Sequence, residues 1–233
     1  MTTEERPYSP GLAGVLAGET ALSLVDGANG RLLYRGYPIG ELVREGSFAQ
    51  VAHLLWADEW LPEAHLPCAP LSRPILAALR DLPDGAHPMD ALRTAFSVWG
   101  ASNRTVWPPT VEQAREVTAM APSALAAFGR LRQGLEPVEP DPSLDTTAGF
   151  LYQLNGEVPD EASARALDAY FIVGADHGFN ASTFAARVIT ATRSDIASAV
   201  SGATGALKGP LHGGAPSEVV SQLNAIGSPE AAE

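Results

Sequence analysis

The sequence predicts a mainly α-helical fold with a small N-terminal β-hairpin. Three observations support this fold class. From about residue 47 onward, apolar residues recur at the spacing of one face of an α-helix. Capping residues, prolines and glycines separate these patterned segments. Two short apolar runs near the N-terminus flank glycine-containing turn sequences. The chain has 233 residues, of which 45% are hydrophobic, so it is long enough to bury a core.

The hairpin is predicted at about residues 19–36, after a loop-like segment over 1–18 that is rich in proline and glycine. Its strands are the apolar runs 21–25 and 32–34. Between them lie Asp26-Gly27 and Asn29-Gly30, dipeptides that favour tight hairpin turns. A hairpin of this length does not extend into a large sheet.

Helices are predicted for most of the remaining chain. Ser47 and Gln50 have the spacing of a capping box and predict a helix start just before Val51. Further helices are predicted over 71–82, from Pro88 through Trp99, over 110–132 and over 144–154. Pro122 is expected to break or kink the third of these, because proline has no backbone N–H to donate.

The C-terminal third contains two histidines, His177 and His212, each in glycine-rich surroundings at a junction between helices. The first helix of this part begins at Asp160 and is predicted to place Ala164, Leu167, Phe171 and Gly174 on one face. The next begins near Asn180 and Ser182, which can cap it, and others are predicted over 196–203 and 216–226. Glycines beside a histidine let a ligand approach the backbone closely, and a helix N-terminus such as the one predicted after His212 attracts anions.

Charge and cysteine content exclude several functional classes. The net charge of −12 argues against general nucleic-acid binding, which requires a basic surface. No run of 18 apolar residues occurs, so no membrane partner is predicted. The N-terminus lacks the features of a signal peptide, and the single cysteine, Cys68, cannot form an intrachain disulfide. A cytoplasmic protein is therefore predicted.

Other kinds of site are weakly supported by the residues. No CxxC or HxxxH pattern occurs, so no metal site is predicted. Ser182 and Ser201 lack a nucleophile-elbow motif. His53 and His65 are predicted to be structural or solvated, and His87 to cap the helix that it precedes. From the residues alone, His177 and His212 remain open between a structural and a functional role.

Four segments, in order along nearly the whole chain, resemble citrate synthases. Residues 176–188, DHGFNASTFAARV, resemble the first histidine motif of that family, and residues 205–215, GALKGPLHGGA, resemble the second. Upstream matches are residues 18–37, GETALSLVDGANGRLLYRGY, and residues 87–94, HPMDALRT. The chain is identified by these motifs as a member of the citrate synthase family.

The resemblance implies an acyltransferase that condenses oxaloacetate with acetyl-CoA to give citrate and CoA, with acetyl-CoA as a substrate and no resident cofactor. It implies a mainly helical homodimer, with residues 1–233 as the large-domain portion and a small domain that can begin near 224–233. His177 is expected to be catalytic and to bind oxaloacetate, and Asn180 to orient that substrate. His212 is expected to be catalytic, donating a hydrogen bond to the thioester oxygen. Gly213 and Gly214 are expected to bind substrate.

The family also uses a third histidine, a catalytic aspartate and further arginines after the second histidine motif. These are absent from the residues that follow His212, so we expect this sequence to be the N-terminal part of a longer protein or half of a split enzyme. Two alternatives stay open. One is a 2-methylcitrate synthase that uses propionyl-CoA. The other is an inactive relative that acts by dimerising, for which the helix from Leu92 to Trp99 is a candidate interface.

Overall fold

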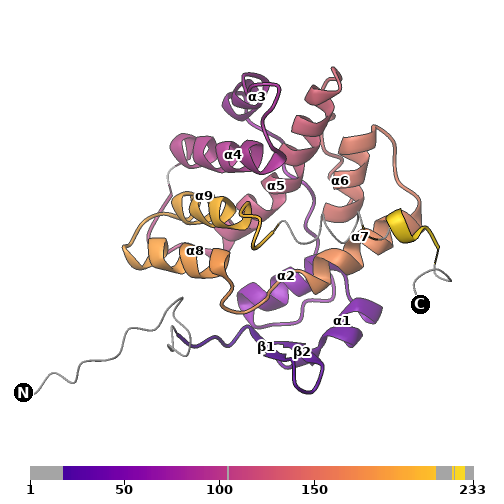
Figure 1. Ribbon diagram of the computed structural model, residues 1–233, viewed down its shortest axis with the longest axis vertical. Helices are drawn as coiled ribbons and strands as arrows, with labels where there is room; N and C mark the ends of the chain where they lie inside the picture. Colours follow the sequence, from indigo (N-terminus) through magenta and orange to yellow (C-terminus); the bar gives the residue numbers. More distant parts are fainter. Residues whose placement is uncertain (1–17, 104, 214–221, 223, 229–233) are drawn as a thin grey trace, which may run out of the picture.

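A computed structural model describes residues 18–103, 105–213, 222 and 224–228 (Figure 1). The described part is mainly helical, with a small sheet beside α1 and α2 at one end of the molecule. The predicted fold class is therefore confirmed.

The hairpin forms where the turn sequences predict it. Strand β1 (Ser23–Asp26) pairs antiparallel with β2 (Arg31–Tyr34), so that Ser23 lies opposite Tyr34. A third strand, β3 (Tyr37–Pro38), pairs with the other edge of β2. Strand β3 is not predicted from the sequence, because two residues are too few to show an alternating pattern.

The helices correspond to the predicted segments with one addition. They are α1 (Ile39–Glu45), α2 (Phe48–Ala57), α3 (Arg73–Arg80), α4 (Pro88–Ser102), α5 (Val111–Arg132), α6 (Thr146–Asn155), α7 (Glu161–Val173), α8 (Ala181–Ala191) and α9 (Ile196–Leu207). Helix α1 was not predicted, since it is short and buries only Leu42 fully. Of the helix predicted over 216–226, residues 222 and 224–226 are helical, and the others lie outside the described residues.

The predicted caps at two helix starts are present. At α2, the Ser47 hydroxyl accepts the Gln50 N–H and the Gln50 side chain accepts the Ser47 N–H, which is a capping box. At α4, Nδ1 of His87 accepts the N–H of Met89 at 3.1 Å. These side chains satisfy N–H groups that have no partner inside the helix.

The predicted break at Pro122 does not occur, because α5 continues through it as one helix. Pro122 is buried near the middle of α5, and this helix packs against α3, α4, α6 and α9. Tertiary packing along the helix outweighs the loss of one backbone hydrogen bond. The sequence shows the proline but not the neighbours that stabilise the helix around it.

Three hydrophobic clusters are present among the described residues, and the two largest organise the fold. The largest joins α3, α4, α5 and α9, with Leu79, Phe96, Trp99 and Phe128 among its buried side chains. The second joins the hairpin, α1, α2 and α7. Its buried members are Tyr34, Leu42, Val51, Leu54 and Ile172. The second cluster fixes the hairpin against α7, which leads into the His177 segment.

The buried side of α7 differs from the predicted face. Ala164, Leu167 and Phe171 are only half-buried and Gly174 is exposed, whereas Asp168 and Ile172 are buried. Asp168 can occupy this buried position because its carboxylate has hydrogen-bonding partners. Its carboxylate accepts the N–H of Phe48 at the start of α2 at 3.0 Å and pairs with Arg165 at 3.1 Å. Burial raises the pKa of Asp168 despite these contacts.

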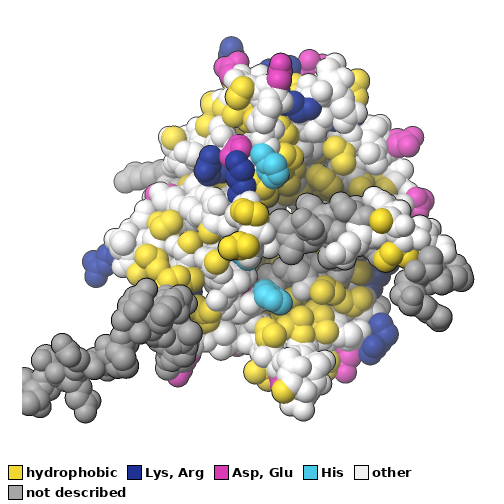
Figure 2. Space-filling model, viewed as in Figure 1, with side chains coloured by type: hydrophobic (Ala, Val, Ile, Leu, Met, Phe, Trp, Pro, Cys, Tyr) yellow, Lys and Arg dark blue, Asp and Glu magenta, His cyan; other side chains and the backbone are white. Residues whose placement is uncertain are grey.

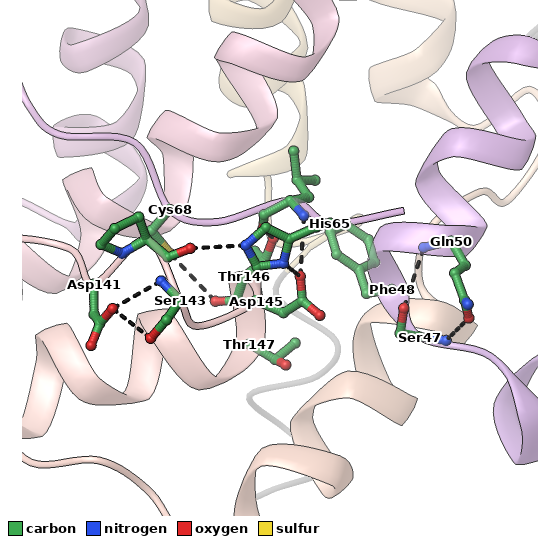
Figure 3. A network of polar contacts seen from close by, with 12 residues as sticks. Ser47, Phe48, Gln50, His65, Cys68, Asp141, Ser143, Asp145, Thr146 and Thr147 are labelled. Carbon is green, nitrogen blue, oxygen red and sulfur yellow. Dashed lines mark hydrogen bonds and ion pairs between the residues drawn. The ribbon is translucent and has the colours of Figure 1, made fainter. Parts of the chain in front are cut away.

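His65 joins the connector between α2 and α3 to the start of α6 (Figure 3). Its Nδ1 lies 2.6 Å from the Asp145 carboxylate, and its Nε2 lies 2.9 Å from the carbonyl oxygen of Pro142. The protonated ring can donate to both acceptors. The hydrogen bond to the Pro142 carbonyl is the main cause that raises the pKa of His65 above its ordinary value of 6.5, and the Asp145 carboxylate raises it further. His65 was predicted to be structural or solvated, and these two contacts show the structural alternative.

This contact predicts a pH-dependent stability. Because the folded pKa is raised, the contribution of His65 is fully present below pH 6.5 and is lost as the pH rises through the folded pKa. We expect the free energy of unfolding of His65→Gln to fall below that of the wild type at about pH 5.5, and by less at about pH 9. Urea unfolding at both pH values measures this. A difference that is constant or grows with pH would contradict the prediction.

Candidate functional site

The structure brings the two histidine motifs to the N-terminal end of α8. His177 lies in the segment between α7 and α8, and His212 lies in the turn that follows α9. Helices α8 and α9 pack side by side (Figure 1), so the end of α9 returns the chain toward the start of α8. This arrangement brings the His212 turn close to the start of α8, although the two segments are far apart in the sequence.

His212 contacts α8 through Ser182. Its Nε2 lies 2.8 Å from Oγ of Ser182 and 3.3 Å from the backbone nitrogen of the same residue. The Ser182 hydroxyl in turn lies 2.8 Å from Oδ1 of Asn180. That Oδ1 also accepts the N–H of Thr183 at 2.8 Å, so Asn180 is the N-cap of α8, as predicted. These contacts join both motifs in one hydrogen-bonded cluster.

Two neutral tautomers of His212 fit the contacts of Nε2 with Ser182. In one, Nε2 donates to Oγ of Ser182, whose own proton goes to Oδ1 of Asn180. In the other, Nε2 accepts the backbone N–H of Ser182 and the ring carries its proton on Nδ1. The donor N–H belongs to the first turn of α8, where backbone N–H groups lack intrahelical partners. In this second tautomer, Nδ1 can donate a hydrogen bond to an oxygen on a bound molecule. The helix N-terminus that meets His212 is thus that of α8, while the predicted helix start after residue 215 lies outside the described residues.

His177 is exposed, and the residue before it anchors its backbone. Oδ1 of Asp176 accepts the N–H of Gly178 at 2.9 Å and the hydroxyl of Ser23 in the hairpin. Gly178 has a φ of +65°, a left-handed conformation that favours glycine. The Asp176 carboxylate is therefore engaged by Gly178 and Ser23 and not by the His177 ring. The catalytic and binding roles of His177 remain predictions.

The glycine after His212 is required by close packing. A Cβ at Gly213 would lie 2.3 Å from the backbone oxygen of Leu207, and the Gly213 N–H donates to that same oxygen at 3.0 Å. The N–H of His212 donates to the carbonyl of Gly209 at 2.9 Å, which holds the turn closed. Substrate binding by Gly213 stays a prediction, and Gly214 lies outside the described residues.

Two contacts of this site gave no signal in the sequence. Ser182 is 30 residues from His212, and Ser23 is 153 residues from Asp176. Spacing along a chain cannot reveal pairs of this separation. The sequence indicates Ser182 only as a residue that can cap a helix, whereas the structure shows it as the hydrogen-bond partner of a predicted catalytic histidine.

Two further properties of the described residues concern metal binding and membrane spans. In that part of the chain, no group of three or more His, Cys, Asp and Glu residues has the arrangement to hold a metal ion. Among the same residues, no helix combines the length and the hydropathy needed to span a membrane.

The comparisons with known proteins agree on one family. The family model described as "Citrate synthase, C-terminal domain" matches residues 11–233. A 2-methylcitrate synthase from Mycobacterium tuberculosis is 44% identical over 239 residues, which cover 98% of this chain and 61% of the relative. A citrate synthase from Mycolicibacterium smegmatis is 43% identical over 248 residues, which cover 100% of this chain and 66% of the relative.

A solved structure extends the comparison to three dimensions. It is the ternary complex of carboxymethyl coenzyme A and oxaloacetate with citrate synthase from Thermoplasma acidophilum. Its TM-score is 0.84 at 26% identity, covering 96% of this chain and 62% of that one. The chain thus spans less than two thirds of the length of each of these relatives.

Proposed function

The chain belongs to the citrate synthase family, and from this premise we propose that the protein carrying it condenses oxaloacetate with acetyl-CoA. The reaction consumes one water and yields citrate and free CoA. One observation carries the proposal beyond family membership. The two histidine motifs meet at the N-terminal end of α8, where Nε2 of His212 contacts Ser182, and we propose the tautomer in which Nδ1 carries the proton and donates it to substrate.

The proposed chemistry assigns a role to each histidine. As the acetyl methyl group loses a proton, negative charge develops on the thioester oxygen, and the Nδ1–H of His212 stabilises it. Such a donor is effective because it is in place before the charge forms. The enol carbon then attacks the carbonyl carbon of oxaloacetate, which His177 and the side-chain amide of Asn180 hold. The resemblance places the base, an aspartate, after the second histidine motif.

A second candidate is the same condensation with propionyl-CoA. It is favoured by one observation, that a relative named 2-methylcitrate synthase is 44% identical to this chain. The relative named citrate synthase is 43% identical, so identity does not separate the two substrates. The difference between them is one methylene group on the acyl chain, which a hydrophobic pocket discriminates by about 10- to 200-fold.

The test is oxaloacetate-dependent release of the CoA thiol by the whole protein that carries this chain, with each acyl-CoA in turn. We expect release from acetyl-CoA, with a higher kcat/KM than from propionyl-CoA, and none when oxaloacetate is omitted. The reverse order of kcat/KM would establish the second candidate. No release from either, by a protein that still dimerises, would favour the inactive relative.

We also propose that the protein is a homodimer and that its copies meet across α4 and α9. In the predicted interface helix, Phe96 and Trp99 are buried inside the chain, so the surface it presents is made of other residues. A hollow of about 500 Å³ lies there. Its lining residues are Arg93, Thr94, Ser97, Val98, Ser201, Gly202 and Gly205.

Figure 2 shows positive, negative and histidine side chains close together over the same α4 and α9 region. Lys208 at the end of α9 lies 2.6 Å from the Asp90 carboxylate of α4, and Arg93 lies 3.0 Å from it. Such mixed charges at the edge of a hollow are typical of the polar rim of an interface.

A single substitution tests this surface. Ser97 is exposed, and Ser97→Arg would place a long charged side chain at the hollow. We expect light scattering to show a dimer for the wild type and a monomer for Ser97→Arg, because burying an unpaired charge in the interface costs much free energy. Ala57→Arg, at the exposed end of α2, is the matched control and should leave the dimer intact. A monomeric wild type, or a dimeric Ser97→Arg, would contradict the proposal.

The cytoplasmic location and the absence of a resident cofactor remain predictions from the sequence. Support for coenzyme A and oxaloacetate as ligands comes from the Thermoplasma acidophilum citrate synthase, whose complex contains carboxymethyl coenzyme A and oxaloacetate.

A further inference from the structure

We propose that Tyr34 in the hairpin and Arg187 in α8 are positioning residues, which hold the His177 loop, residues 176–180, in its substrate-binding conformation. The inference rests on the proposed function, because it concerns how His177 is presented to oxaloacetate. His177 is exposed, so the backbone that carries it decides where its ring lies. That backbone is held on both sides of His177 by groups from other elements.

The first anchor lies before His177. The Tyr34 side chain is fully buried, and its hydroxyl lies 2.8 Å from the carbonyl oxygen of Val173 and 3.0 Å from that of Asp176. The Asp176 N–H donates back to the hydroxyl at 3.2 Å. One phenol group thus contacts the backbone at the end of α7 and both backbone polar groups of the residue before His177. Burial raises the pKa of this hydroxyl, which agrees with its role as a donor.

The hairpin makes a second contact at the same point. The Ser23 hydroxyl donates to the Asp176 carboxylate, and Ser23 pairs with Tyr34 across β1 and β2. The pairing register therefore delivers both contacts from adjacent positions of the sheet. A hairpin with a different register would present other side chains to Asp176.

The second anchor lies after His177. The guanidinium of Arg187 stacks over the Phe179 ring, 4.5 Å from its centroid. The Phe179 ring also lies close to Gly18: a Cβ added at Gly18 would lie 3.0 Å from Cζ of Phe179. The same Cβ would lie 3.8 Å from a terminal nitrogen of Arg187, so Gly18, Phe179 and Arg187 form one packed group. A planar guanidinium suits this position because it stacks on aromatic rings.

The two anchors predict a selective effect on oxaloacetate. Tyr34→Phe keeps the buried ring and removes only the hydroxyl, so the loop loses its contacts at Val173 and Asp176. We expect KM for oxaloacetate to rise about tenfold, because small displacements of a binding group are costly. KM for acetyl-CoA should change by less than about twofold, since His212 is held separately through Ser182. Tyr170→Phe, which removes an exposed hydroxyl from α7, is the matched control.

Arg187 is tested together with its stacking partner. Arg187→Met and Phe179→Leu should each raise KM for oxaloacetate, and the double variant should be no worse than the more affected single variant, because both act through one contact. Arg73→Met, at an exposed arginine of α3, is the matched control. An arginine that bound oxaloacetate directly would behave differently, since Phe179→Leu would then leave KM unchanged. That result would overturn its positioning role.

Amide hydrogen exchange over residues 174–180 provides a readout independent of turnover. Tyr34→Phe should accelerate exchange in this segment while the core helices α4 and α5 keep wild-type rates, which separates loop release from general destabilisation. If the wild type turns over and Tyr34→Phe shows the wild-type KM for oxaloacetate and wild-type exchange rates, the positioning proposal alone is overturned. Absence of oxaloacetate-dependent thiol release in the wild type would overturn the proposed function, and with it the positioning role.

Discussion

The variant His212→Ala is expected to release CoA from acetyl-CoA about 1,000-fold more slowly than the wild type, at the upper end of what loss of one oxyanion donor costs. In the wild type, the Nδ1–H of His212 is the group that we expect to stabilise charge on the thioester oxygen. That charge develops mainly in the transition state, so kcat and kcat/KM should fall by similar factors. KM for oxaloacetate should change little, because we propose that His177 and Asn180 bind that substrate. Steady-state kinetics with each substrate varied in turn measures these values.

Two variants control this result. His87→Asn replaces a histidine that caps α4 with another good capping residue, so activity should be retained. Ser182→Ala removes the hydroxyl that lies 2.8 Å from His212 and keeps the backbone N–H, so we expect an intermediate loss of about tenfold. A wild-type kcat in His212→Ala would refute the catalytic role of this residue.

The largest expected effect on stability comes from Gly100→Ala in α4. A Cβ at position 100 would lie 2.3 Å from Cβ of Ala197 in α9, and Ala197 is buried. Neither short side chain can rotate away, so the two helices must separate. We expect the free energy of unfolding to fall by about 2 kcal/mol, within the usual range for overpacking a core. Urea unfolding followed by circular dichroism measures the change.

Gly85→Ala is the matched control, because a Cβ at that position would meet nothing within 4 Å. Its free energy of unfolding should stay within about 0.5 kcal/mol of the wild type, as for most surface substitutions. Equal effects of the two substitutions would show that the close approach of α4 and α9 does not exist in solution.

Much of this architecture follows from local features that a sequence displays. The turn dipeptides of the hairpin, the capping box at Ser47 and the cap at His87 each act within four residues, and all three occur where predicted. The histidine motifs belong to the same group, since a family resemblance is carried by short runs of residues. Local hydrogen bonding and chain geometry are enough to specify such features.

Other features were decided by contacts between distant segments. Pro122 stays within a continuous α5 because neighbouring helices pack around it, and Asp168 is buried because Phe48 and Arg165 satisfy its carboxylate. Arg165 is only three residues from Asp168, but Phe48 is 120 residues away, and neither it nor the helices around Pro122 can be read from the neighbouring sequence.

The same division applies to the site. The sequence by itself determined that His177 and His212 lie at helix junctions and belong to citrate synthase motifs. Only the tertiary structure decided that His212 meets Ser182 at the start of α8, and that Tyr34 of the hairpin supports the residue before His177. A hydrogen bond depends on positions a few ångströms apart, and packing of the whole core sets these positions for residues separated by 30 or 142 places in the chain.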